Sequence, residues 1–179
     1  MTTTYHAVEA DMLPLAFASS DLHRSFCDSL NMVPGLRTDV PELAWHYDEP
    51  GSPDWASTIE RTRLVSARTR KVLEPLLSPA DSVQWLPATL TTSGGECLTY
   101  WVMHFPAAFD PYDPVATVRG PSGLAMPGTE VLSAARIAGH EIFAPPQQVD
   151  TVFVTERVIN AMRDNGLTGW IAELMPTTA

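Results

Sequence analysis

Two short stretches of this chain share one pattern, and that pattern decides the fold. Residues 64–73 read Leu-Val-Ser-Ala-Arg-Thr-Arg-Lys-Val-Leu, and residues 153–162 read Phe-Val-Thr-Glu-Arg-Val-Ile-Asn-Ala-Met. In each, two apolar residues precede a hydroxyl residue, an arginine follows two positions later, and a helical run comes next. The hydroxyl can accept a hydrogen bond from a free N–H group of the first turn, so Ser66 and Thr155 are predicted helix caps. Gly166 stands where a left-handed residue ends the second helix.

An apolar segment with a tryptophan follows each helical run, at 83–86 and at 169–171. A strand–helix–strand unit is therefore predicted twice, roughly ninety residues apart. Further strands are predicted at 82–90 and 96–105, joined by a Gly-Gly hairpin turn. We expect an α+β fold, in which two or three helices pack on a mainly antiparallel sheet that contains the duplicated strand–helix–strand unit.

The length and composition fit one globular domain. The chain has 179 residues, of which 45% are hydrophobic, and this is enough for a core of its own. We expect a single domain over 1–179, with 1–54 as its N-terminal portion. The two cysteines lie far apart and form no disulfide framework. Because the start of the chain lacks the pattern of a secretory signal and no stretch has the length of a membrane span, a cytoplasmic location is expected.

The charge is strongly acidic and unevenly distributed. The net charge is −10, and no Lys or Arg occurs at 38–60 or at 72–118. Such a surface disfavours nucleic acid and anionic membranes, because phosphates need cations opposite them. It favours a basic protein partner, although the same charge can simply confer solubility.

Two segments combine acids with aromatic residues in these cation-free regions, namely Glu42–Trp55 and Asp110–Asp113. Aromatic anchors surrounded by charge are typical of protein interfaces. The predicted partner-binding residues are Glu42, Trp45, Tyr47, Asp48, Glu49, Asp54, Trp55, Asp110, Tyr112 and Asp113. The alternative for the first segment is a surface stretch whose aromatic side chains attach it to the core.

Motifs that carry chemistry are missing from the sequence. Ser122 does not stand in a Gly-x-Ser-x-Gly elbow, and His140-Glu141 does not continue into the metalloprotease pattern. His104, on a predicted strand, is more typical of a packed residue than of a catalytic base. We therefore expect no enzymatic activity, no cofactor and no metal site.

Several segments together have a familiar order. The first copy of the pattern is followed by Val-Gln-Trp-Leu-Pro at 83–87, and Gly-His-Glu-Ile-Phe at 139–143 precedes Val-Phe-Val-Thr-Glu-Arg-Val at 152–158. Over residues 55–174 this resembles a bacterial family of uncharacterised domains grouped with the immunity proteins of polymorphic toxin systems, the immunity-eleven type common in myxobacteria. The family's usual Ser-Glu-Arg is Ser-Ala-Arg in the first copy and Thr-Glu-Arg in the second, so the acid at the middle position is not shared.

The resemblance implies an α+β domain that works by binding rather than by catalysis, with a cognate toxin as its partner. It also implies that the Ser-Glu-Arg segments are structural, with the hydroxyl capping the helix and the arginine pairing near its own helix. Two other functions stay open. One is an adaptor or regulator of a cytoplasmic signalling protein such as a nucleotide-dependent switch, and the other is a hydrolase.

Overall fold

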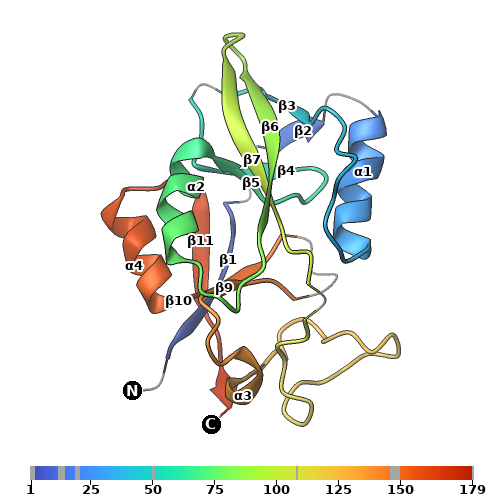
Figure 1. Cartoon of the computed structure of the whole chain (residues 1–179), viewed down its shortest axis with the longest axis vertical. Helices are drawn as coiled ribbons and strands as arrows, with labels where there is room; N and C mark the ends of the chain where they lie inside the picture. Colours follow the sequence, from blue (N-terminus) through green and yellow to red (C-terminus); the bar gives the residue numbers. More distant parts are fainter. Residues whose placement is uncertain are drawn as a thin grey trace.

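The fold combines several sheets with short helices (Figure 1). The computed structural model describes residues 3–11, 15–18, 21–49, 51–107, 109–145 and 150–178. Its strands are β1 (Tyr5–Ala10), β2 (Leu15–Ala18), β3 (Ala44–Tyr47), β4 (Trp55–Thr58), β5 (Leu64–Ser66), β6 (Gln84–Thr92), β7 (Cys97–His104), β8 (Leu132–Ser133), β9 (Ile142–Phe143), β10 (Val152–Thr155), β11 (Trp170–Leu174) and β12 (Thr177–Thr178). Its helices are α1 (Asp21–Met32), α2 (Ala67–Leu73) with the 3-10 turn η1 (Glu74–Leu76), α3 (Ala134–Ile137) and α4 (Glu156–Asp164). The predicted α+β class is confirmed.

Two larger sheets share one strand order. One is a closed barrel in the order β2-β3-β6-β7-β5-β4, and the other is a four-stranded sheet in the order β11-β1-β10-β9. The run β6-β7-β5-β4 of the barrel and the whole second sheet are antiparallel throughout. The correspondence between the two sheets extends to one more strand. β3 pairs in parallel with β6 in the barrel, and β8 pairs in parallel with β12, the strand that follows β11. The duplication predicted for two strand–helix–strand units therefore extends over the chain, as a first repeat (5–92) and a second repeat (97–178).

The first strand of each repeat lies in the sheet of the other repeat. Strand β7 begins the second repeat but lies between β5 and β6 of the first, while β1 lies between β10 and β11 of the second. The register fixes the equivalence, since Tyr100 pairs with Ser66 and Tyr5 pairs with Thr155. This exchange makes the N-terminal strand a central strand of the second sheet.

Helices α2 and α4 lie side by side against the two sheets (Figure 1). The core beneath them takes Val8 from β1 and Met103 from β7, together with Val158, Ile159 and Met162 of α4. Side chains alternate between the two faces of a strand, so Leu98, Tyr100 and Val102 of β7 point the other way and pack in the separate core of the barrel. One strand with two apolar faces thus joins both cores.

Two of the three predicted helix ends are confirmed. The Ser66 hydroxyl accepts from the Thr69 N–H at 3.1 Å and caps α2. Gly166 has φ +59, and the Leu167 N–H donates to the Met162 carbonyl at 3.1 Å, which is the bond of a Schellman ending. The prediction for Thr155 is wrong. It occupies the N-cap position, but its hydroxyl makes no cap bond and donates to Glu141 instead.

Candidate functional site

Asp54 belongs to a joint between the repeats and not to a free surface. Asp54 is only 7% exposed. Its carboxylate oxygens accept hydrogen bonds from Ser66 Oγ at 2.7 Å and from Arg68 Nη1 at 3.1 Å. The same carboxylate accepts from the Thr168 N–H at 3.1 Å. Arg68 then reaches the carbonyls of Asn165 and Gly166, where α4 ends. The prediction that Asp54 contacts a partner is wrong, because its oxygens are already used inside the molecule.

The second repeat has the equivalent set of contacts, which runs from the start of α4 to the end of η1. Glu141 accepts from the Thr155 hydroxyl and pairs with Arg157 Nη2 at 3.2 Å. Arg157 in turn donates to the Leu76 carbonyl at 3.0 Å, at the end of η1. Each arginine therefore pairs with an acid at the start of its own helix, as expected, and also contacts the end of the other helix. The reason is that the last carbonyls of a helix lack internal donors and carry partial negative charge.

The aromatic residues of the first predicted interface are buried. Trp45, Tyr47 and Trp55 are 0%, 5% and 2% exposed. Trp45 and Tyr47 fill the barrel, and Trp55 lies under the helices. These three predictions are corrected, because apolar rings on short strands find more buried area inside the fold than on its surface. Glu42, Asp48 and Glu49 are exposed, and residue 50 of this segment lies outside the described residues.

The second predicted interface is also built into the fold. Tyr112 is 4% exposed, and its ring centroid lies 6.0 Å from that of Phe153. Asp110 Oδ2 accepts from Arg119 at 2.8 Å and from Arg136 at 2.9 Å. The backbone N–H groups of residues 116 and 115 donate to Asp113 Oδ1, and these bonds hold the pKa of Asp113 below its usual value. Both carboxylates therefore organise the loop that carries them.

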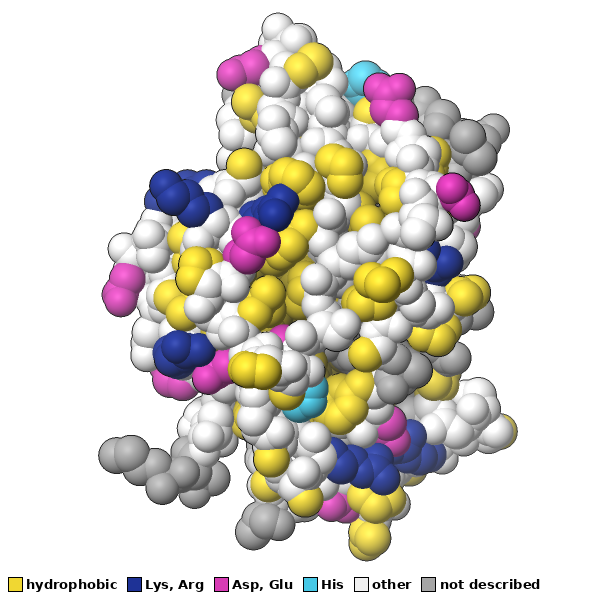
Figure 2. Space-filling view, viewed as in Figure 1, with side chains coloured by type: hydrophobic (Ala, Val, Ile, Leu, Met, Phe, Trp, Pro, Cys, Tyr) yellow, Lys and Arg dark blue, Asp and Glu magenta, His cyan; other side chains and the backbone are white. Residues whose placement is uncertain are grey.

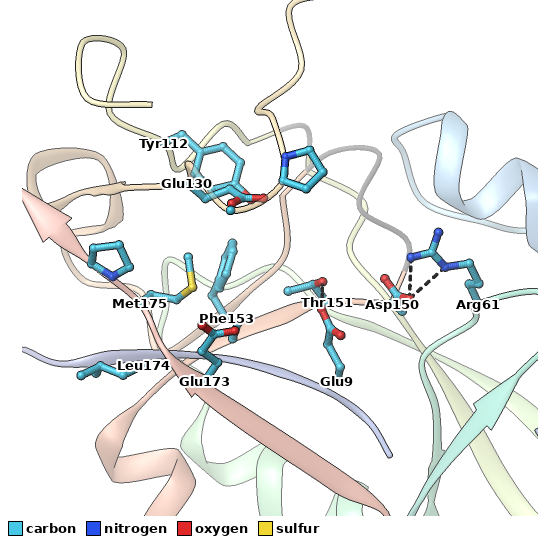
Figure 3. Close-up of a pocket in the computed structure, with 14 residues that line it drawn as sticks. Glu9, Arg61, Tyr112, Glu130, Asp150, Thr151, Phe153, Glu173, Leu174 and Met175 are labelled. Carbon is cyan, nitrogen blue, oxygen red and sulfur yellow. Dashed lines mark hydrogen bonds and ion pairs between the residues drawn. The ribbon is translucent and has the colours of Figure 1, made fainter. Parts of the chain in front are cut away.

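The structure instead shows a cavity of about 530 Å³ on the face of the second sheet that lies opposite α2 and α4. Figure 3 shows Glu9, Phe153 and Glu173 on the sheet side of the cavity. Tyr112 and Glu130 face them from the segment between β7 and β8. The strand register explains why Phe153, Ala7 and Glu173 lie in a row along the sheet side of the cavity. Ala7 of β1 pairs with Phe153 on one side and with Glu173 on the other. The other lining residues are Arg61, Pro127, Gly128, Asp150, Thr151, Leu174, Met175 and Pro176.

The cavity is acidic. It is lined by four carboxylates, Glu9, Glu130, Asp150 and Glu173, and by one guanidinium, Arg61. Arg61 is already paired with Asp150, at 2.8 Å from Nη2, at one end of the cavity (Figure 3). Glu9 accepts from the Thr151 hydroxyl at 2.6 Å, and no residue in the described ranges forms a hydrogen bond or ion pair with Glu130 or Glu173. Within the same ranges no group of His, Cys, Asp and Glu side chains has the arrangement of a metal site.

Arg61 is the only Lys or Arg among the residues that line the cavity. In Figure 2, Lys and Arg side chains gather over α2 and α4, where Arg68, Arg70 and Arg157 pair with acids, and again near the bottom of the view. Arg70 also lies over the ring of Trp101, 4.0 Å from its centroid. The sheet face opposite these helices is consequently left with an excess of carboxylates.

Comparison of the repeats shows that the cavity replaces a core. Val102 pairs with Leu64 and Leu86 in the barrel, just as Ala7 pairs with Phe153 and Glu173 in the second sheet. Leu86 and Val102 are each 2% exposed and belong to the barrel core. In the second sheet the equivalent positions hold Glu173 and Ala7. A smaller side chain and a charged one therefore stand where the barrel is filled with apolar atoms.

The sequence contains a signal for this site that the local patterns did not reveal. Thr-Tyr occurs at 4–5 and again at 99–100, and these two tyrosines are the equivalent residues of the exchanged strands. An alignment of the repeats from these points places Glu9 opposite His104. Only the strand pairing shows that His104 belongs to the barrel and that Glu9 lines the cavity on the second sheet.

The two histidines considered as catalytic candidates have structural partners. His104 is buried, and its Nε2 lies 2.8 Å from the Gly35 carbonyl oxygen. Burial lowers the pKa of His104 from its ordinary value. His140 Nδ1 lies 3.0 Å from Asp81 Oδ1, and Asp81 also accepts from the backbone N–H of Ile142 at 3.2 Å.

A scan of the chain against protein-family models finds no matching family, and a search of curated proteins finds no match. The resemblance to immunity proteins therefore stays a prediction. Within the described residues, no helix has both the length and the apolar character needed to cross a membrane.

Proposed function

We propose that this chain is a non-catalytic protein-binding module of the immunity type, which binds and neutralises a cognate basic toxin in the cytoplasm of a bacterium. The observation that carries the proposal is the acidic cavity on the second sheet, where Glu173 and Ala7 stand at the positions that hold the apolar core of the barrel. The resemblance of residues 55–174 to immunity proteins supports the same function.

The surroundings of the cavity fit a protein better than a phosphate-bearing ligand. Ile171 and Leu174 on the neighbouring strand β11 are 49% and 61% exposed. Apolar side chains next to carboxylates suit a protein surface that carries Lys or Arg, and the same carboxylates repel phosphate groups. The net charge of −10 would also speed association with a basic partner.

Capture of the partner from the native host tests the proposal. Tagged wild-type chain and the double variant Glu9→Gln/Glu173→Gln would be expressed there, with Asp48→Asn/Glu49→Gln as a matched control that removes two exposed charges outside the cavity. We expect the wild type and the control to retain one basic protein that the cavity variant loses. That protein should stop growth when expressed alone, and growth should recover when this chain is co-expressed.

The outcomes separate the competing functions. A captured signalling protein that does not inhibit growth would replace the immunity role with an adaptor or regulatory role. Equal capture by the wild type and the cavity variant would remove the cavity from the binding site. Thermal unfolding of every variant shows that a lost partner is not caused by a lost fold.

A further inference from the structure

We infer that the partner enters the second repeat as an extended segment bearing Lys or Arg, which lies along the outer edge of β11 and places its basic side chains in the cavity. This inference rests on the proposed function and names the element of the partner that is recognised. The free edge of β11 and the matching position in the first repeat carry it.

Strand β11 is the last strand of its sheet and pairs with β1 alone in the described part of the chain. The Met175 N–H donates to Tyr5, and the Gly169 carbonyl accepts from Asp11, so the odd-numbered residues from 169 to 175 direct their backbone groups to β1. Backbone direction alternates along a strand, and Trp170, Ala172 and Leu174 therefore present N–H and C=O groups on the outer edge. Such an edge is a template for another strand.

The first repeat has a segment of its own chain at the corresponding place. Arg37 donates its N–H to Gln84 Oε1 at 2.9 Å and accepts from Gln84 Nε2 at 2.7 Å. The Gly35 carbonyl is bonded to His104 at 2.8 Å. Residues 35–37 thus bind at the start of β6 through the side chains of β6 and β7.

The equivalent residues of the second sheet are suited to a different occupant. Gln84 pairs with His104 across the first sheet, and Ile171 pairs with Glu9 across the second. His104 and Gln84 can both donate, whereas Glu9 only accepts when ionised and Ile171 offers an exposed apolar surface. The position that holds a backbone carbonyl in the barrel therefore favours a cationic donor in the second sheet.

A second contrast concerns the edge itself. Pro87 of β6 pairs with Trp101, and Leu174 of β11 pairs with His6, so these two residues are equivalent. β3 pairs only with residues 89–92 of β6, and proline removes an outward N–H from the part of β6 that β3 does not reach, which disfavours strand addition there. Leu174 keeps that N–H, so the second repeat retains an edge that can accept a strand.

A partner segment of basic charge is chosen over a second copy of this chain. Two copies would each bring a net charge of −10, and pairing of β11 with β11 would place the two acidic cavities close together. A Lys- or Arg-bearing segment instead supplies the opposite charge to Glu9, Glu130 and Glu173. Light scattering at increasing concentration checks this choice, because a dimer that Leu174→Pro dissociates would overturn it.

Calorimetric titration of the full chain with synthetic peptides tests the inference. The probe is a peptide of about ten residues in which Lys alternates with Thr, long enough for one strand. A peptide with Glu in place of Lys is the charge control. We expect the basic peptide alone to bind, with an affinity that falls as salt is raised.

Two variants examine the edge and the charge separately. Leu174→Pro removes an outward N–H at a position where the first repeat already has proline, and it should abolish binding without lowering the melting temperature. Glu9→Gln/Glu173→Gln should weaken binding by about tenfold or more, whereas Asp48→Asn/Glu49→Gln should leave it unchanged. If Leu174→Pro unfolds the chain, the same peptide with N-methylated alternate residues replaces it, because methylation removes the N–H groups that would pair with β11.

The results that overturn the inference are distinct from those that overturn the function. Absence of binding by the basic peptide, or equal binding by the Leu174→Pro chain or the methylated peptide, removes strand addition at β11. Capture of a toxin by the Leu174→Pro chain in the host would then still leave the proposed function standing. Loss of toxin capture only in the cavity and edge variants supports both.

Discussion

Replacement of Gly169 by alanine should be among the most destabilising single changes in this chain. Gly169 has φ +79, and a Cβ placed on it would lie 2.4 Å from the Trp55 carbonyl oxygen and 2.6 Å from the Pro53 Cβ. The neighbouring contacts hold the repeats together, since the Trp55 N–H donates to the Thr168 carbonyl at 3.0 Å. The methyl group therefore forces apart the start of β4 and the start of β11.

The magnitude follows from three contributions. The left-handed backbone costs a non-glycine residue about 1–2 kcal/mol. Displacement of residues 53–55 would break the bonds of the Trp55 and Asp54 N–H groups to Thr168, at about 1 kcal/mol each. Disturbed packing around the buried Trp55 adds about 1–3 kcal/mol. We expect a total loss of roughly 4–7 kcal/mol in the free energy of unfolding from these terms.

Gly123→Ala is the matched control. Gly123 has φ +80 but nothing within 4 Å of an added Cβ, so it should show only the backbone cost of about 1–2 kcal/mol. Urea unfolding followed by circular dichroism gives both free energies. Equal losses for the two variants would refute the close approach of β4 and β11 as the cause.

Three further sets of experiments test the helix ends, the buried histidine and the thiols. Ser66→Ala should lower the free energy of urea unfolding by about 1–2 kcal/mol, because it removes the cap of α2. Thr155→Val should cost about 1 kcal/mol, whereas Thr155→Ser keeps the hydrogen bond to Glu141 and most of the stability. Because burial holds the pKa of His104 below 6.5, the unfolded chain takes up a proton that the folded chain refuses, so stability should fall as the pH drops below 6.5, and less steeply in His104→Gln. A thiol reagent at pH 8 should label exposed Cys97 in the folded chain but not Cys27, whose pKa burial raises to about 12.

Each of these has a result that contradicts it. A Thr155→Val variant as stable as Thr155→Ser would show that the hydroxyl contributes nothing through its donated bond. Identical pH profiles for the wild type and His104→Gln would mean that this histidine titrates alike in the folded and unfolded chains. Labelling of Cys27 at the rate of Cys97 would show that α1 opens readily.

Local patterns were enough to predict much of the secondary structure. The hydroxyl residue before each helical run, the Gly-Gly hairpin and Gly166 all act through bonds within a few residues, and such bonds form in the same way wherever the segment lies. The prediction of a repeated strand–helix–strand unit therefore holds, although Thr155 directs its hydroxyl to Glu141 because this carboxylate, just before β9, lies within reach.

Longer-range features followed from strand pairing. Nothing in the residues around Tyr5 or Tyr100 indicates that each strand is inserted into the sheet of the other repeat, since that choice depends on the area buried by the whole assembly. Trp45, Tyr47 and Tyr112 resemble interface anchors in the sequence because an aromatic ring among acids has the same composition on a surface and over a core.

The acidic cavity illustrates the same division. Glu9 and Glu173 lie far apart in the sequence, each among unrelated neighbours, and alternation alone could place either on a solvent-facing side. They line one cavity because β1 pairs with β10 and β11 at a register that puts Ala7, Phe153 and Glu173 in a row. Helix caps and turns are set by contacts between neighbours in the chain, whereas this site depends on which strands meet, and that is settled by burial over the whole molecule.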